Sequence, residues 1–146
     1  MANGSGEACA VEWLVKRSLI DYMATAGDFE VETSGGAEFS LDDGALIPAV
    51  RAADGIVRMT GAVVLRAHGG ALAVPIVDGE IAEGMLSIAD PVEEGERMAL
   101  VAVEEIPGVD GSERRWSAKL ADDADVLFQF TYGPRTPFDD VVVRAA

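Results

Sequence analysis

The stretch GIVRMTGAVVLRAHGGALAVPIV, residues 55–77, holds two runs of aliphatic and β-branched residues on either side of the turn His68-Gly69-Gly70. Side chains branched at Cβ favour extended strands, and adjacent glycines supply the positive φ angles that tight hairpin turns need. We therefore predict a pair of antiparallel strands joined at this turn, with His68 at its mouth.

Segments of similar character lie on both sides of this hairpin. Residues 28–33 and 36–41 alternate apolar with acidic or polar side chains, which predicts two half-buried strands. Further strands are predicted at GMLSIAD (84–90), RMALVAVEE (97–105), RWSAKLA (115–121), DVLFQFTY (125–132) and DVVVRA (140–145). About nine short strands and a single helix favour a mainly β fold, namely an antiparallel β-sandwich or barrel-like sheet with one N-terminal helix packed on it.

The stretch VEWLVKRSLIDYMATAG, residues 11–27, has a helical period, and Gly27 is suited to end the helix. At about 100° per residue, one side of this helix is formed by Val11, Val15, Ser18, Tyr22 and Ala26. Trp13 and Ile20 lie on the opposite side, so the helix has two apolar faces. Such a helix is either buried all round or covers something other than protein. Tyr22 is accordingly either a core tyrosine whose hydroxyl bonds a backbone acceptor, or part of a ligand site.

The length of 146 residues and the hydrophobic content of 49% suit one globular domain. We expect a disordered leader at residues 1–10 and a single domain over residues 11–146. The start of the chain lacks the basic residues and the uninterrupted apolar run of a secretory signal. This predicts a cytoplasmic protein as the sequence is written, or a secreted or cell-envelope protein if the N-terminus is a trimmed one.

The charge balance narrows the range of partners. Eleven basic and 26 acidic residues give a formal net charge of −15, which disfavours nucleic acid and anionic membranes as partners. The sequence has no apolar stretch long enough to span a membrane. One cysteine, Cys9, and one histidine, His68, exclude a zinc site built from these two residue types.

Three segments of the chain carry a resemblance to a known family. EWLVKRSLIDYM (12–23), VLRAHGGALAV (64–74) and FTYGPRTPFDDV (130–141) resemble, in this order, signature segments of the HtaA-type haem-binding domains of actinobacterial haem uptake. The resemblance runs from about Val11 to Val143, nearly the whole chain. Three departures stand beside it: Leu14 where the family has glycine, Leu19 where an aromatic residue usually follows the serine, and Asp139-Asp140-Val141 in place of Asp-Pro-Val.

The resemblance implies a ferric haem b site and assigns roles by position. Tyr22 would be the axial ligand of the iron, His68 would hydrogen-bond to the tyrosine oxygen, and Ser18 would contact a propionate. The family also places an aromatic residue against the porphyrin, for which Phe130 is the first candidate, with Phe128 or Phe138 behind it.

Haem would add two propionates to an already acidic protein, so nearby cations are needed. Arg66, next to the histidine turn, and Lys16 or Arg17, near the helix, are the candidates. The alternative for each of them is an ordinary solvated surface charge.

Iron chemistry is consistent with a tyrosine ligand. A free phenol has a pKa near ~10 and is only about 0.1% ionised at neutral pH, so a cation is needed to hold it deprotonated. Ferric iron is such a cation, and an anionic oxygen ligand favours Fe(III) over Fe(II). A histidine N–H donated to that oxygen would orient the ligand and moderate its donor strength.

Three function classes follow from these observations. The first is a non-enzymatic haem carrier, uptake or storage protein, favoured as a monomer, with haem donor or acceptor proteins as further partners. The second is a tyrosinate-ligated haem enzyme, which is disfavoured because no second histidine is left for acid–base work once His68 serves Tyr22. The third is a β-sandwich interaction module that has lost haem.

Overall fold

The structure is a computed structural model that describes residues 6–107, 113–128, 132, 133 and 135–145. Within these ranges the chain forms twelve strands, one α-helix and two 3-10 helices. The elements are β1 (Gly6–Trp13), α1 (Arg17–Thr25), β2 (Glu30–Ser34), β3 (Glu38–Ser40), β4 (Gly44–Ala52), β5 (Val57–Met59), β6 (Ala62–Ala67), η1 (His68–Gly70), β7 (Leu72–Ile76), β8 (Glu80–Ala82), β9 (Met85–Ala89), β10 (Arg97–Glu105), β11 (Glu113–Leu120), η2 (Ala124–Phe128) and β12 (Pro137–Ala145).

A closed antiparallel barrel makes up the larger part of the molecule. Its strands follow the order β1-β12-β11-β10-β9-β8-β5-β4, and pairing of β1 with β4 closes the ring. Strand β3 pairs with residues 44–46 of β4, next to residues 49–51, which pair with β5. Closure leaves the ring strands without free edges, which are otherwise sites of unwanted strand pairing. The predicted mainly β, barrel-like antiparallel fold with one N-terminal helix is confirmed.

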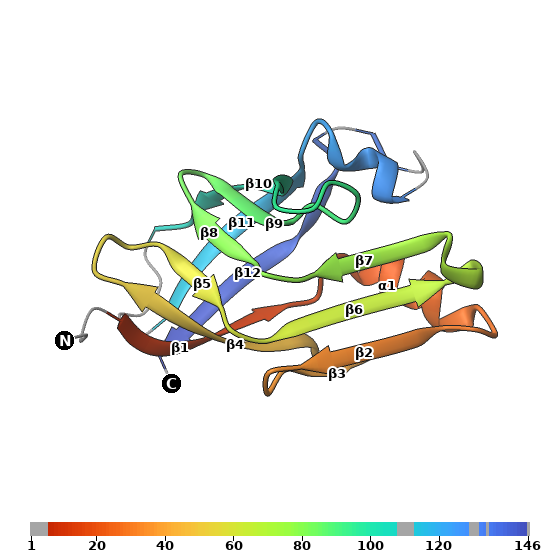
Figure 1. The fold of residues 1–146 in the computed structure, drawn as a ribbon, viewed down its shortest axis with the longest axis horizontal. Helices are drawn as coiled ribbons and strands as arrows, with labels where there is room; N and C mark the ends of the chain where they lie inside the picture. The colour runs from red at the N-terminus through yellow and green to blue at the C-terminus, as the bar shows by residue number, and fades with distance from the viewer. Residues whose placement is uncertain (1–5, 108–112, 129–131, 134, 146) are drawn as a thin grey trace.

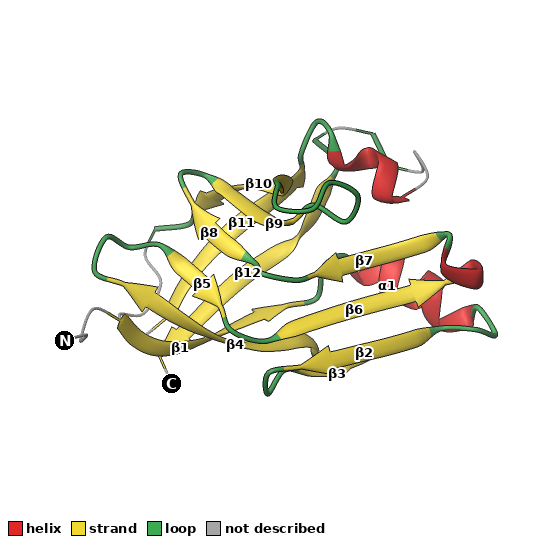
Figure 2. Cartoon of the chain, in the orientation of Figure 1, coloured by secondary structure: helices red, strands yellow, loops and turns green. Residues whose placement is uncertain are grey.

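A second sheet extends beyond one end of the barrel. It has the order β2-β6-β7, and its hairpin β6–β7 turns at η1, as predicted for residues 55–77. Figures 1 and 2 show α1 beside this hairpin and η1 at its tip, at the end of the molecule opposite to the start of β1. One face of the hairpin belongs to the same buried core as the helix: Val63, Leu65, Ala67, Leu72, Val74 and Ile76 from the strands, and Leu19, Ile20 and Met23 from α1.

Residues 6–10 and the first part of the predicted helix differ from expectation. Residues 6–13 form β1, so the strand begins inside the segment predicted to be a disordered leader. Burial along β1 alternates, with Cys9, Val11 and Trp13 buried and the residues between them partly exposed. This period of two suits a strand, and pairing with both β4 and β12 stabilises it. The predicted helix over residues 11–27 is therefore wrong before Arg17, and only Arg17–Thr25 is helical.

Other strand predictions also need correction. Residues 44–52 form the long strand β4, which was missed because Pro48 interrupts its apolar pattern. The predicted strand at 125–132 begins instead with the 3-10 helix η2, and the rest of that stretch is only partly described. Strand β2 forms as predicted, yet all five of its residues are exposed, so it is not half-buried.

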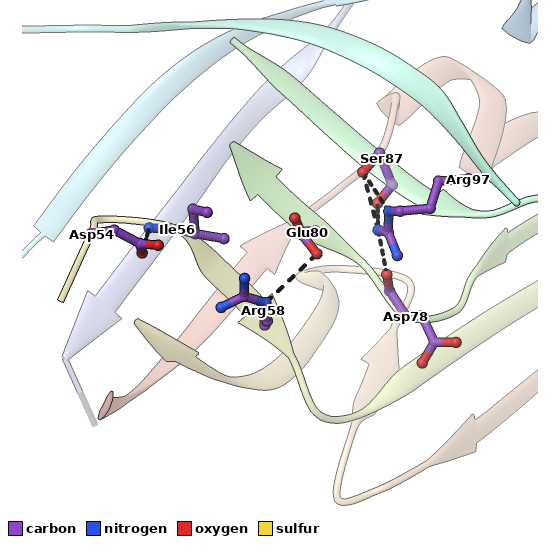
Figure 3. Close-up of polar contacts among 7 residues, drawn as sticks. All are labelled: Asp54, Ile56, Arg58, Asp78, Glu80, Ser87 and Arg97. Atoms are coloured by element: carbon purple, nitrogen blue, oxygen red, sulfur yellow. Dashed lines mark hydrogen bonds and ion pairs between the residues drawn. The ribbon is translucent and has the colours of Figure 1, made fainter. Parts of the chain in front are cut away.

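Polar contacts fix the connections between the short barrel strands (Figure 3). The Arg97 guanidinium donates to the Asp78 carbonyl at 2.6 Å and to the Ser87 hydroxyl at 3.0 Å. Arg58 and Glu80, on neighbouring strands β5 and β8, lie 3.7 Å apart. These side chains belong to the barrel rather than to the region around α1 and η1, and they serve as structural ties.

In the described ranges, no helix has the length and apolar character needed to cross a membrane.

Candidate functional site

Strand β12 sets the position where α1 begins. The Trp13 indole N–H donates to the Asp139 carbonyl at 2.8 Å, and the Asp139 N–H donates to the Val15 carbonyl at 2.9 Å. Val15 takes a φ of 62°, which turns the chain from the direction of β1 into the helix. The helix that carries Ser18 and Tyr22 is thus attached at its N-terminal end to the barrel.

The helix has one buried face and one exposed face. Leu19, Ile20 and Met23 are at most 2% exposed and pack in the core. Tyr22 lies on the other face with 55% of its surface exposed, and Ser18, one turn earlier, is exposed as well. Tyr22 is therefore not a core tyrosine, and the exposed face of α1 is free to contact something other than the core.

The hydroxyl of Tyr22 faces the only histidine of the chain. The two partners come from different elements: Nε2 of His68, at the start of η1, lies 3.1 Å from Oη of Tyr22 on α1. Their ring centroids are 5.5 Å apart, with an angle of 45° between the planes. His68 has a φ of 56°, in the left-handed region. Its backbone thus leaves the extended conformation of β6 where its side chain meets the tyrosine.

Asp28 holds the turn that carries His68. Its Oδ1 accepts a hydrogen bond from the His68 backbone N–H at 3.0 Å, and its Oδ2 accepts one from the Gly69 N–H at 2.5 Å. The Gly69 bond, followed by the His68 bond, lowers the pKa of this carboxyl below its ordinary value. Asp28 was not among the site residues predicted from the sequence. One feature of the sequence could have indicated it: Asp28 directly follows Gly27, the glycine predicted to end the helix. Aspartate in such a position often accepts hydrogen bonds from backbone N–H groups.

The basic residues proposed from sequence have other partners. Arg66 pairs with Glu32 across β6 and β2 at 2.7 Å, on the sheet face opposite to the buried Leu65 and Ala67. Among the hydrogen bonds and ion pairs of the described residues, none joins Arg66 to Tyr22 or His68. Arg66 instead takes part in a partly exposed ion pair with Glu32.

The two cations near the start of α1 are also engaged. Arg17 donates to the carbonyls of Leu41 and Asp42 at 2.5 and 2.6 Å. Lys16 donates to the Pro137 carbonyl at 2.9 Å and lies 5.5 Å from the ring centre of Tyr132. Both side chains therefore attach the helix start to neighbouring loops.

The aromatic candidates fall into two groups. Phe128 and Phe138 are 1% and 6% exposed, and they pack edge to face with centroids 5.4 Å apart. Their rings are part of the core and are not available to a ligand in this conformation. Phe130, the first candidate for stacking on a porphyrin, lies outside the described residues.

The Tyr22–His68 pair can offer a metal ion one oxygen ligand, the Tyr22 hydroxyl, with the His68 imidazole next to it. In the described part of the chain, no group of three or more His, Cys, Asp or Glu side chains is placed to hold a metal ion. A phenol that is half exposed and next to an imidazole can instead coordinate a metal that brings its other ligands with it. The imidazole can either accept the phenol proton or donate a hydrogen bond to the ionised oxygen.

Comparison with known proteins gives matches in structure but not in sequence. No protein-family model matches the chain, and no curated protein matches it. Three solved structures from Corynebacterium glutamicum share its fold. The C-terminal domain of HtaA has a TM-score of 0.72 at 18% identity, covering 97% of this chain and 98% of that domain. The N-terminal domain of HtaA has a TM-score of 0.69 at 12% identity, again covering 97% and 98%.

The third match is the heme binding protein HtaB, with a TM-score of 0.70 at 11% identity, covering 95% of this chain and 93% of that one. All three coverages extend over almost the entire chain. The chain therefore has the HtaA-type fold, in agreement with the resemblance of its three sequence segments to that family.

Proposed function

We propose that this protein binds ferric haem b without enzymatic activity, as a carrier, uptake or storage protein, and that Tyr22 is the axial ligand. The observation that carries the proposal is the exposed Tyr22–His68 pair, 3.1 Å between Oη and Nε2. The pair lies in a fold that this chain shares with the heme binding protein HtaB. Haem supplies an iron with four porphyrin nitrogens, so a single protein oxygen completes a usable ligand set.

Tyr22 fits the part of an axial ligand because of its environment. The helix holds its backbone through the buried Leu19 and Met23, while 55% of the tyrosine remains exposed. A flat ligand can therefore approach the hydroxyl without displacing core side chains. Ligation requires loss of the phenol proton, which the positive charge of ferric haem favours.

His68 would act on the tyrosine oxygen rather than on the iron. Its Nε2 is already at hydrogen-bond distance from Oη, so the Nε2–H tautomer can donate to the phenolate. Such a donated bond fixes the orientation of the phenolate and lowers its basicity. With this bond from His68, keeping Tyr22 ionised costs less free energy than keeping an isolated phenol ionised.

Ser18 is the polar group available to a propionate along the same helix face. It lies four residues before Tyr22 and is exposed. Because Arg66, Lys16 and Arg17 already have partners, we infer that the propionates are directed toward water, with the Ser18 hydroxyl as their contact on α1.

A haem titration tests this proposal. Wild-type protein should give a Soret band and the ligand-to-metal charge-transfer absorption of an iron–phenolate bond, whereas Tyr22→Phe should lose both. Tyr132→Phe is the matched control, because Tyr22 and Tyr132 are the two tyrosines of the chain. Loss of the charge-transfer band in Tyr132→Phe but not in Tyr22→Phe would reject the assignment. No haem binding by wild type would favour the interaction module, and peroxide turnover would favour the enzyme.

A further inference from the structure

The carboxylate of Asp28 connects the two elements that carry the Tyr22–His68 pair. Asp28 lies in the loop between α1, which ends at Thr25, and β2, which begins at Glu30. From there it accepts the two backbone N–H groups at the start of η1, at 3.0 Å from His68 and 2.5 Å from Gly69. One side chain thus attaches the end of the helix to the tip of the hairpin.

The turn at η1 lies at the surface, where core packing does not hold it. His68, Gly69 and Gly70 have φ angles of 56°, 67° and 90°, and all three residues are exposed. Two consecutive glycines have wide conformational freedom, so core packing does not fix this backbone. A side chain that accepts both N–H groups removes much of that freedom.

The two hydrogen bonds of Asp28 also affect the position of the His68 imidazole. The Asp28 bonds act on the backbone of His68 itself and of the next residue, and so they set the direction in which the ring leaves the chain. Both His68 and Tyr22 are exposed, so core packing does not hold the imidazole in place. Without the carboxylate, the bond from the Ala71 N–H to the His68 carbonyl, at 3.2 Å, and the Nε2 to Oη contact would remain to hold His68 in place.

We propose that Asp28 is a positioning residue for haem binding, which holds His68 at hydrogen-bond distance from Tyr22 by fixing the backbone of the turn. This inference rests on the proposed function. Asp28 does not contact the phenol, and its effect passes through His68. Removing Asp28 should therefore matter only while His68 is present.

A double-mutant cycle tests this dependence. Asp28→Ala should speed haem dissociation by up to the ~10 to 100-fold typical when a group that orients a metal ligand is lost. His68→Asn should have a similar effect, and the double variant should be no worse than His68→Asn alone. Additive losses in the double variant would show that Asp28 acts independently of His68 and would overturn the proposal.

Two further variants separate positioning from general stability. Asp28→Asn keeps one acceptor oxygen and should restore part of the haem retention. Asp90 provides the matched control, because its Oδ1 likewise accepts two backbone N–H groups, from Val92 at 2.8 Å and Glu93 at 3.0 Å, in a different loop. Asp90→Ala should leave haem dissociation unchanged, and an effect equal to that of Asp28→Ala would reject a specific role.

A measurement on haem-free protein distinguishes failure of this inference from failure of the proposed function. His68 is the only histidine, so its ring ¹⁵N signals are unambiguous. At fixed neutral pH, Asp28→Ala should shift them in the same direction as Tyr22→Phe, because both changes remove the hydrogen bond between Nε2 of His68 and Oη of Tyr22. Unchanged ¹⁵N signals in Asp28→Ala would overturn the positioning role, whether or not wild type binds haem.

Discussion

Nε2 of His68 lies 3.1 Å from Oη of Tyr22, although 46 positions separate the two residues in the chain. The helix supplies one partner from its exposed face, while Met23, the next residue, is fully buried. Two adjacent positions of α1 therefore serve different purposes. One stabilises the fold and the other is available to a ligand, so changes at the two positions should have separable effects.

The first prediction compares these two neighbours. Met23→Ala should lower the free energy of unfolding by about 2–5 kcal/mol, because it leaves a cavity in the core. Tyr22→Ala should change it by less than about 0.5 kcal/mol, because an exposed side chain contributes little to packing. Urea denaturation of the haem-free proteins measures both values. If Tyr22→Ala proves as destabilising as Met23→Ala, then Tyr22 is a structural residue after all.

The second prediction concerns the partner of the tyrosine. His68→Asn removes the imidazole while asparagine still tolerates the φ of 56° at this position. Haem should still bind through Tyr22, with a shifted charge-transfer band and an affinity lower by ~10 to 100-fold. Competition with a haem acceptor gives the affinity ratio. A complete loss of binding, equal to that of Tyr22→Phe, would instead identify His68 as the iron ligand.

The third prediction follows from the lowered pKa of Asp28. Because its folded pKa lies below 3.8, its two hydrogen bonds stabilise the turn above that pH and are lost as the pH falls through the folded pKa. The amide proton shift of Gly69, followed by NMR in haem-free protein, should therefore have its midpoint below 3.8. Asp28→Asn should show no such transition. A midpoint at or above 3.8 in wild type would mean that the carboxylate does not hold the turn.

Local patterns predicted much of this fold. The hairpin at residues 55–77 and the alternation in several other segments indicated an antiparallel, barrel-like sheet, because strand period and turn glycines are local properties. The N-terminal stretch was misread because residues 11–16 also fit the helical period that continues into α1. Pairing with both β4 and β12, which no local pattern reveals, makes this segment a strand.

The residues of the candidate site, too, could be predicted only in part from the sequence. Tyr22 and His68 could be selected from sequence by residue type and resemblance, and the fold brings them together. Arg66 could not be excluded beforehand, because its pairing with Glu32 depends on the register between β6 and β2. Asp28 was overlooked for a similar reason. Its importance arises from backbone groups 40 and 41 positions away, which only the folded chain brings within reach.

The last prediction concerns release of haem on reduction. Ferric haem carries one net positive charge at its centre, which the Tyr22 phenolate would cancel, whereas ferrous haem carries none. Without that charge the protein has no cation to hold a phenol ionised, and a free phenol is protonated at neutral pH. His68, whose Nε2 lies 3.1 Å from the oxygen, is placed to pass that proton to Tyr22. The neutral phenol is a weak ligand, so reduction should loosen the haem.

Transfer to apo-myoglobin, followed by absorbance before and after dithionite addition, measures this effect. We expect faster transfer from the reduced protein than from the oxidised one. Free haem mixed with apo-myoglobin and dithionite controls for the rate of uptake by the acceptor. Because the expectation depends on the charge of the ligand, it applies to tyrosinate ligation and not to ligation by neutral His68. Equal transfer rates in the two oxidation states would therefore argue against an anionic Tyr22 ligand.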